Sequence, residues 1–277
     1  MASVMADKKK LKLLIVSIVT LVVTIALTIT RSIIMVIGFN SNSMQYSMDV
    51  APFTHVVIIA CAVLAVLIIL SYFLIKNYEI ASFSISTPLK ASTSVLFIIV
   101  GVLNAVSVLS KNVGSYSSSS TYAAYRLILI ICTVFAVASG IYLLFTIKEK
   151  KKNLNIISSV LPLWAAMSIL ASYFNPDYTH TDTNRMVYCL MLIGSAIMFV
   201  KASKNMVYET NNYLSSILGS LLSLAFSIIF LVPNVVYMLS AGKSMTLFGV
   251  DNLVAIAIIL FSTGVILQAL KKDTALD

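Results

Sequence analysis

Residues 12–37 read KLLIVSIVTLVVTIALTITRSIIMVI, and this run determines the fold class. A transmembrane helix needs about 20 mostly apolar residues to cross a hydrocarbon layer of about 30 Å, and this run is long enough. Seven further apolar runs follow it. The sequence therefore predicts an all-α, polytopic transmembrane helical bundle of about eight spans, arranged as four hairpins in a single membrane domain, 1–277. The predicted spans are about 12–37, 51–75, 91–110, 122–147, 154–174, 186–203, 213–239 and 250–270.

The composition leaves no room for a soluble domain. Of the 277 residues, 60% are hydrophobic and 10% are charged, whereas soluble domains carry about 25% charged residues. The first span also exceeds the roughly 7–15 apolar residues at the core of a cleaved signal peptide. We therefore expect the whole chain to form one integral membrane domain.

Positive charge is concentrated on one side of the predicted bundle. When the loops are assigned alternately to two sides, 14 of the 19 lysines and arginines fall on the side of the N-terminus. The other side receives Arg31, Lys111, Arg126, Arg185 and Lys243. This bias follows the positive-inside rule and predicts that both termini are cytoplasmic. The net charge of +9 then serves orientation and contact with anionic inner-leaflet lipids, and we expect no nucleic acid partner.

Two predicted spans carry polar seams at helical spacing. The first-span seam consists of Ser17, Thr20, Thr24 and Thr28, and the seventh-span seam consists of Ser216, Ser220, Ser223 and Ser227. Steps of three or four residues keep each seam on one helix face. Such faces either pack against other helices or line a path for a small polar solute. Asn104, in the third span, is likewise either a contact between helices or a ligand-facing group.

The three arginines all lie at predicted outer span ends: Arg31, Arg126 and Arg185. A guanidinium binds carboxylate or phosphate with two parallel hydrogen bonds, which an ammonium cannot do. The three side chains form a candidate outer site for an anion or a lipid headgroup, and the alternative is pairing with acids in the same loops. From Lys12 to Arg31 a helix rises about 28 Å, so we expect the Arg31 guanidinium to reach the outer headgroups.

Pro162 and Pro233 fall within predicted spans. A proline removes a backbone donor and kinks a helix, and the membrane tolerates this where neighbouring groups satisfy the freed carbonyl. Interrupted helices form substrate sites in many transporters. The alternative for both prolines is a simple bend without a binding role.

The spans offer little reactive chemistry. All ten acidic residues lie in loops or at span ends, which disfavours carriers coupled to protons or sodium through an intramembrane acid. His55 and His180 are the only histidines, and no H-E-x-x-H or nucleotide-binding glycine loop is present. The three cysteines fall inside spans without metal-ligand spacing. We therefore expect no catalytic residue, no cofactor-binding residue and no metal site, and a protein that is not an enzyme.

Residues 160–176, VLPLWAAMSILASYFNP, carry a proline and a tryptophan early in a span and an aromatic outer end. This segment resembles one common to uncharacterised multi-spanning membrane proteins of Gram-positive anaerobic bacteria, and the resemblance covers mainly residues 160–203. It implies a bacterial cytoplasmic (plasma) membrane and carries no assigned activity.

Two functions lead on these observations, ahead of a third, a membrane enzyme that acts on an outer-leaflet lipid and needs His55 or His180 beside a nucleophile. The first is a non-enzymatic component that binds lipid or partner proteins, including other membrane subunits, in an envelope or transport assembly. The alternative is a permease for a small neutral or weakly anionic solute, with a path between the first and seventh spans. If the two seams face each other across a wet cavity, transport is favoured; if they are closed by packed backbone, transport is disfavoured.

Overall fold

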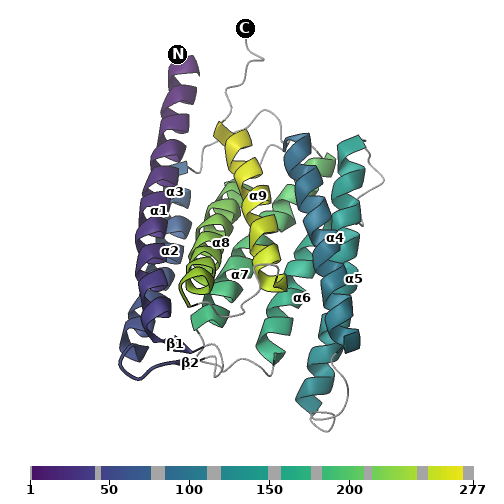
Figure 1. Ribbon diagram of the computed structural model, residues 1–277. Coiled ribbons are helices and arrows are strands. Elements are labelled where there is room, and N and C mark those ends of the chain that lie inside the picture. Colours follow the sequence, from purple (N-terminus) through teal and green to yellow (C-terminus); the bar gives the residue numbers. More distant parts are fainter. Residues whose placement is uncertain are drawn as a thin grey trace.

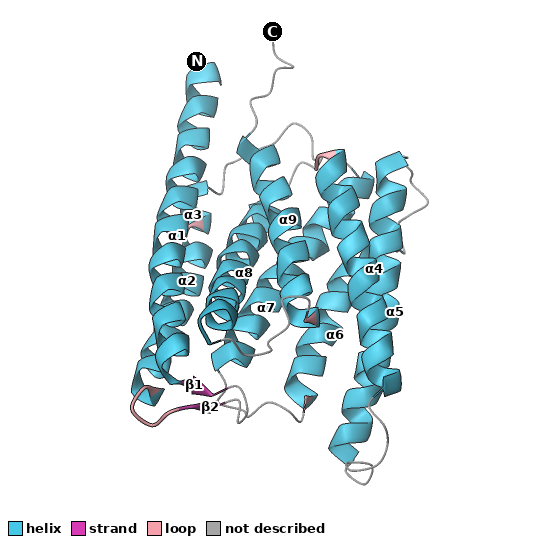
Figure 2. Cartoon of the chain, in the orientation of Figure 1, coloured by secondary structure: helices cyan, strands magenta, loops and turns pink. Residues whose placement is uncertain are grey.

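The computed structural model describes residues 2–40, 45–75, 85–110, 120–148, 157–175, 183–208, 214–241 and 249–270. Within these ranges, eight helical segments are long and apolar enough to cross a membrane. They agree with the eight predicted spans and confirm an all-α polytopic bundle. Figure 2 shows helix along almost the whole described chain. Hydrocarbon offers the backbone no hydrogen-bond partner, so each span must form its bonds internally as a helix.

The first two spans come before a ring of six further helices. They comprise α1 (Ala2–Gly38), α2 (Ala51–Leu70) and the short α3 (Tyr72–Ile75), with two-residue strands β1 (Phe39–Asn40) and β2 (Gln45–Tyr46) between α1 and α2. The six others are α4 (Thr87–Ser110), α5 (Ser120–Lys148), α6 (Val160–Phe174), α7 (Thr183–Tyr208), α8 (Leu214–Ala241) and α9 (Val250–Leu270). A single 3-10 turn, Ile157–Ser159, precedes α6.

Packing between neighbours closes the last six helices into a ring. Each of α4 to α9 packs against the next helix in the chain, and α9 packs back against α4. The first helix packs on the outside of this ring against α8, and α2 lies beside α1 (Figure 1). Burial agrees with this arrangement. In the 18-residue apolar segment of each span, 67% of the residues are buried in α8, against 28% in each of the first two spans.

The start of α1 and the end of α9 lie at the same end of the bundle (Figure 1), as an even number of spans requires. The opposite end carries β1 and β2 and is called the β end below. There, β1 and β2 pair antiparallel, with Phe39 opposite Tyr46. The Tyr237 hydroxyl of α8 donates a hydrogen bond to the Phe39 carbonyl at 3.1 Å, which ties this connection to the ring.

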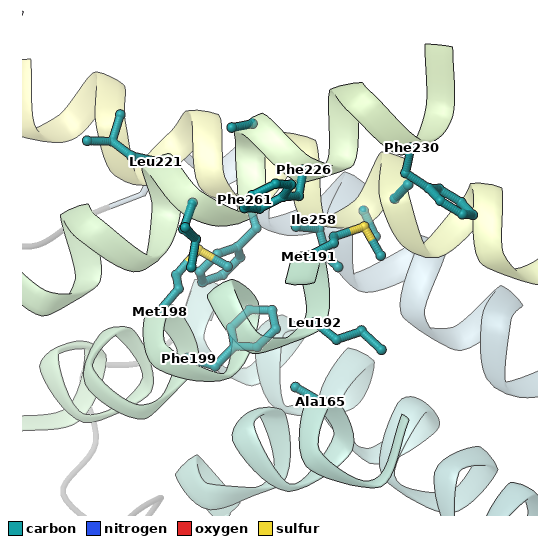
Figure 3. Close-up of a cluster of buried hydrophobic side chains, with 14 of the residues drawn as sticks. Ala165, Met191, Leu192, Met198, Phe199, Leu221, Phe226, Phe230, Ile258 and Phe261 are labelled. Carbon is teal, nitrogen blue, oxygen red and sulfur yellow. The ribbon is translucent and has the colours of Figure 1, made fainter. Parts of the chain in front are cut away.

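Aromatic side chains fill the middle of the ring. The aromatic layer consists of Phe97, Trp164, Phe199 and Phe261, which come from α4, α6, α7 and α9. The ring centroids of Phe97 and Trp164 lie 4.6 Å apart, and those of Phe199 and Phe261 lie 5.2 Å apart. Figure 3 shows Phe199 and Phe261 within the surrounding apolar core. Such tilted contacts suit the quadrupoles of aromatic rings, and they fill the space between four helices.

Glycines allow α7 and α8 to approach at backbone distance. A Cβ atom at position 219 would lie 2.4 Å from the Met198 nitrogen, and one at position 194 would lie 2.7 Å from the Ser223 nitrogen. In lipid, helices associate mainly through van der Waals packing instead of the hydrophobic effect, and small residues allow the close approach that this packing needs. This helix pair therefore depends on the absence of side chains at Gly194 and Gly219.

We expect Gly219→Ala to lower the thermal unfolding midpoint of the purified protein in detergent. The added methyl group would meet backbone atoms of α7, and such overpacking costs about 1–3 kcal/mol. Gly264→Ala is the matched control, because its Cβ would meet the Ile85 side chain at 2.7 Å, and a side chain can shift. Equal losses for the two variants would contradict this account of the α7–α8 contact.

Candidate functional site

A cavity of about 170 Å³ lies inside the six-helix ring. All six helices contribute to its wall, and α1 contributes none of the lining residues. Its lining residues on α5, α7 and α9 lie near the N-terminal ends of those helices, at the β end. On α6 the lining runs from Trp164 to Asn175, a rise of about 16 Å. The cavity therefore extends from the β end to roughly half the thickness of a bilayer.

The wall of this cavity is rich in neutral hydrogen-bonding groups. Its amides and hydroxyls from α4, α6 and α7 are Asn104, Ser107, Ser168, Ser172, Asn175 and Asn184. Tyr125 and Tyr188 add phenol groups. Polar groups inside a membrane protein normally find protein partners, because an unpaired group in an apolar environment costs free energy. A cavity lined in this way is suited to water or to a polar solute.

One of these amides has no hydrogen-bond partner among the described residues. The Asn104 side chain is 8% exposed and lines the cavity, and within the described ranges no residue hydrogen-bonds to it. Asparagine offers two donors and two acceptor lone pairs. The structure places Asn104 at the cavity, and no hydrogen bond joins its side chain to another helix among the described residues.

Two opposite charges line the same cavity from different helices. Arg185 lies in the first turn of α7 and Asp251 in the first turn of α9. A helix N-terminus stabilises negative charge, and Asp251 lies at such a position in α9. The Arg185 guanidinium donates to the Tyr173 carbonyl at 2.7 Å and lies 5.2 Å from the Tyr173 ring centroid.

The floor of the cavity is apolar. Trp164 belongs both to the cavity lining and to the aromatic layer. The lining residues Val100 on α4 and Val254 on α9 lie closer to the β end than Phe97 and Phe261, the layer residues of these two helices. Phe97 lies one turn from Val100 on α4, farther from the β end, and contacts Trp164. The aromatic layer therefore lies between the cavity and the opposite end of the bundle.

Arg31 lies behind the cavity wall rather than at the membrane surface. Its side chain is 1% exposed, and its guanidinium donates to the Ile229 carbonyl on α8 and to Asn184 Oδ1 on α7. It also lies 6.0 Å from the Phe230 ring centroid. The expectation that Arg31 reaches outer headgroups is wrong, because its polar partners lie inside the protein. Asn184 and Phe230 both line the cavity, so Arg31 contacts two residues of the cavity wall from outside the ring.

Pro233 explains why α8 offers Arg31 a carbonyl. In an α-helix the N–H of residue 233 would bond to the carbonyl of residue 229, and proline has no N–H. Pro233 lies inside α8, and the carbonyl that it leaves without a helical partner is the one bound by Arg31. Just beyond, the Asn234 amide donates to Asn252 Oδ1 of α9 at 3.3 Å. Pro162, by contrast, lies in the first turn of α6, where no helical bond is lost.

The three candidate arginines occupy different layers of the protein. Arg185 lines the cavity, and Arg31 binds the residue before it, Asn184. Arg126 is half-buried and follows the lining residue Tyr125, but it is not itself part of the lining. Arg31 and Arg185 are therefore connected through α7, because Arg31 binds Asn184, the residue before Arg185. Binding of an anion or headgroup by these arginines stays a prediction.

The two predicted seams are packed against protein. Thr24 and Thr28 each donate to the carbonyl four residues earlier on α1, at 2.7 Å. On α8, all four seam serines are fully buried. Ser223 there shares a 2.7 Å hydrogen bond with Ser262 of α9, and its backbone closely approaches Gly194 of α7. Neither seam lines the cavity, which lies within the ring. The expected solute path between the first and seventh spans is therefore wrong, and the packing of the two seams does not support transport.

A third polar seam, not predicted above, lies on α6. Trp164, Ser168, Ser172 and Asn175 follow one another on α6 at intervals of four, four and three residues, and all line the cavity. This spacing was available in the sequence. Asp251 was among the loop acids expected as possible partners of the arginines, whereas Asn184, at a helix start, carried no comparable signal.

No family model matches this chain, and neither a curated protein nor a solved structure matches it. The candidate site therefore rests on its own geometry.

A double-mutant cycle tests the contact between Arg31 and the proline-freed carbonyl. Arg31→Met leaves buried acceptors unpaired, at about 1–3 kcal/mol for each. Pro233→Ala restores an N–H for the Ile229 carbonyl. We therefore expect Arg31→Met to cost about 1 kcal/mol less in the Pro233→Ala background, measured by unfolding in detergent.

Pro162→Ala provides the control background for this cycle, because Pro162 lies in a helix start. There the cost of Arg31→Met should be unchanged. If Arg31→Met lowers the unfolding free energy equally in all three backgrounds, the contact with the Ile229 carbonyl does not account for the contribution of Arg31 to stability.

Proposed function

We propose that this multi-pass membrane protein is a permease that binds a small polar solute in the cavity of the six-helix ring. The observation that carries the proposal is the Asn104 amide, which is buried in the ring yet faces the cavity without a protein partner in the described ranges. An unpaired buried amide costs stability, and a bound solute offsets that cost.

The size of the cavity limits the solute. An apolar cavity of about 150 Å³ holds one benzene molecule, and pockets for drug-sized ligands measure about 300–1,000 Å³. The cavity here measures about 170 Å³. It therefore suits a solute of about six to ten non-hydrogen atoms, with hydrogen-bonding groups that match the amides and hydroxyls of the wall.

The position of the cavity toward one end of the ring supports transport. The lining reaches the β end, and the aromatic layer separates it from the other end of the bundle. Substrate sites of many transporters lie near the bilayer midplane and open to one side at a time. The lysine bias predicts that the β end faces outward, so we propose that solute enters from outside the cytoplasm, in the cytoplasmic membrane that we propose for this chain.

The cavity favours the permease over the other function drawn from the sequence. A component that binds only lipid or partner proteins has no need for a polar cavity within its own ring. That function stays a prediction, and so does the expectation that the protein is not an enzyme.

Uptake into proteoliposomes tests the proposal directly. The full-length protein is reconstituted and offered radiolabelled polyols, amino acids and short organic acids. We expect uptake of at least one class, and Ser168→Phe, which fills the cavity from α6, should abolish it. Leu170→Phe is the matched control, because Leu170 is 43% exposed on the same helix. No uptake and no solute binding across the panel would overturn the permease.

Two asparagine substitutions separate a binding role from a structural one. Asn104→Leu should leave the thermal unfolding midpoint unchanged or raise it while it weakens solute binding, because no described residue loses a partner. Asn184→Leu should lower the midpoint, because Arg31 loses an acceptor in a charged hydrogen bond of about 1.5–3 kcal/mol. Equal destabilisation by the two variants would mean that Asn104 supports the fold.

A further inference from the structure

We propose, on the basis of the proposed function, that the solute is a short aliphatic primary amide. Its C(=O)–NH2 group pairs with the Asn104 side chain, and its hydrocarbon part faces the aromatic layer. The starting observation is that the cavity combines neutral polar groups with an apolar floor, whereas both charged side chains of the lining already interact with protein groups.

The cavity wall keeps a small set of polar side chains for a solute. Every phenol, every charged side chain and every amide of the lining except Asn104 already interacts with another protein group. Within the described ranges, the Ser172 hydroxyl accepts a hydrogen bond only from the Cys189 thiol, at 3.5 Å, and Ser168 lies beside the Cys132 thiol. A thiol is a weak donor and a weak acceptor. Asn104 and the two serine hydroxyls therefore keep hydrogen-bonding capacity.

These three side chains lie at similar depth in the cavity. Phe97 on α4 and Trp164 on α6 are in contact at the floor, and both helices run from there toward the β end (Figure 1). Counted from this contact at the rise of an α-helix, Asn104 lies about 10 Å, Ser168 about 6 Å and Ser172 about 12 Å closer to the β end. The amide on α4 thus lies at a height between the two hydroxyls on α6.

A primary amide is the group that matches Asn104. The asparagine side chain offers N–H donors and a carbonyl acceptor side by side, and a second C(=O)–NH2 group meets both through two parallel hydrogen bonds. A carboxylate has only acceptors and an ammonium group has only donors, so each would leave one side of Asn104 unpaired, which costs free energy. The remaining N–H and lone pair of the amide are left for the hydroxyls of Ser168 and Ser172.

Farther from the β end, the same wall becomes apolar. Val100 follows Asn104 by one turn in this direction on α4, and Trp164 follows Ser168 by one turn on α6. Val254 on α9 adds a third apolar side chain. Burial of hydrocarbon against this surface is favourable, whereas a polar group there would lack a partner. The wall therefore suits a polar head directed toward the β end and a short hydrocarbon tail directed toward the floor.

Ligands of matched shape test this inference on the full-length protein in lipid nanodiscs, by ligand-observed NMR. Propionamide, propionate and butanone differ only in the group that would meet Asn104, and acetamide, urea and glycerol complete the set. Ser168→Phe nanodiscs correct for binding to lipid. We expect propionamide to bind tightest, and acetamide to bind about fourfold more weakly because one buried methylene is lost.

The variant Asn104→Leu assigns the preference to the proposed contact. The preference for propionamide over butanone should fall by about tenfold or more in this variant, because the solvation of the two free ligands is the same for both proteins. Val106→Leu is the matched control on α4, since Val106 is 54% exposed, and it should keep the native preference. An undiminished preference in Asn104→Leu, or an equal fall in both variants, would overturn the amide pairing.

Other outcomes separate the inference from the proposed function. Tighter binding of urea, glycerol or propionate than of propionamide would overturn the aliphatic amide and leave the permease standing. Binding of no ligand, in the native protein as in Ser168→Phe, together with no transport when propionamide joins the uptake panel, would overturn both.

Discussion

The wall of the ring depends on the contact between Arg31 and the Ile229 carbonyl. Pro233 leaves that carbonyl without a helical donor, and hydrocarbon offers no water to replace it. A helix outside the ring supplies the missing donor. The buried guanidinium is in turn acceptable because the carbonyl and Asn184 both receive its hydrogen bonds. Each group would be costly alone, and together they fix α1, α7 and α8 to one another.

This contact gives the first helix a role that its position does not suggest. The six helices α4 to α9 enclose the cavity without α1. Yet α1 holds the side chain of Asn184 and lies against Phe230, two residues of the cavity wall. The shape of the wall is therefore set in part from outside the ring.

The eight spans were predictable because hydropathy is a local property that every residue of a span shares. The direction in which a side chain points around its helix was not. The length of α1 placed Arg31 near the β end of the helix. Position along a helix does not determine whether a long side chain points toward lipid or toward protein. The cavity residues on α6 were visible as a third polar spacing, and Asp251 was visible as a loop acid near the arginines. Asn184 was not, because its importance comes from helices that meet only in the folded ring.

The aromatic layer has a consequence for the electrical behaviour of the protein. If the cavity admits water from the β end, it carries the potential of that side inward. Most of the transmembrane voltage would then fall across the aromatic residues Phe97, Trp164, Phe199 and Phe261. Moving one elementary charge through that field involves about 2.3 kcal/mol for each 100 mV. A solute without net charge does almost no such work, and its passage would therefore be nearly insensitive to the membrane potential.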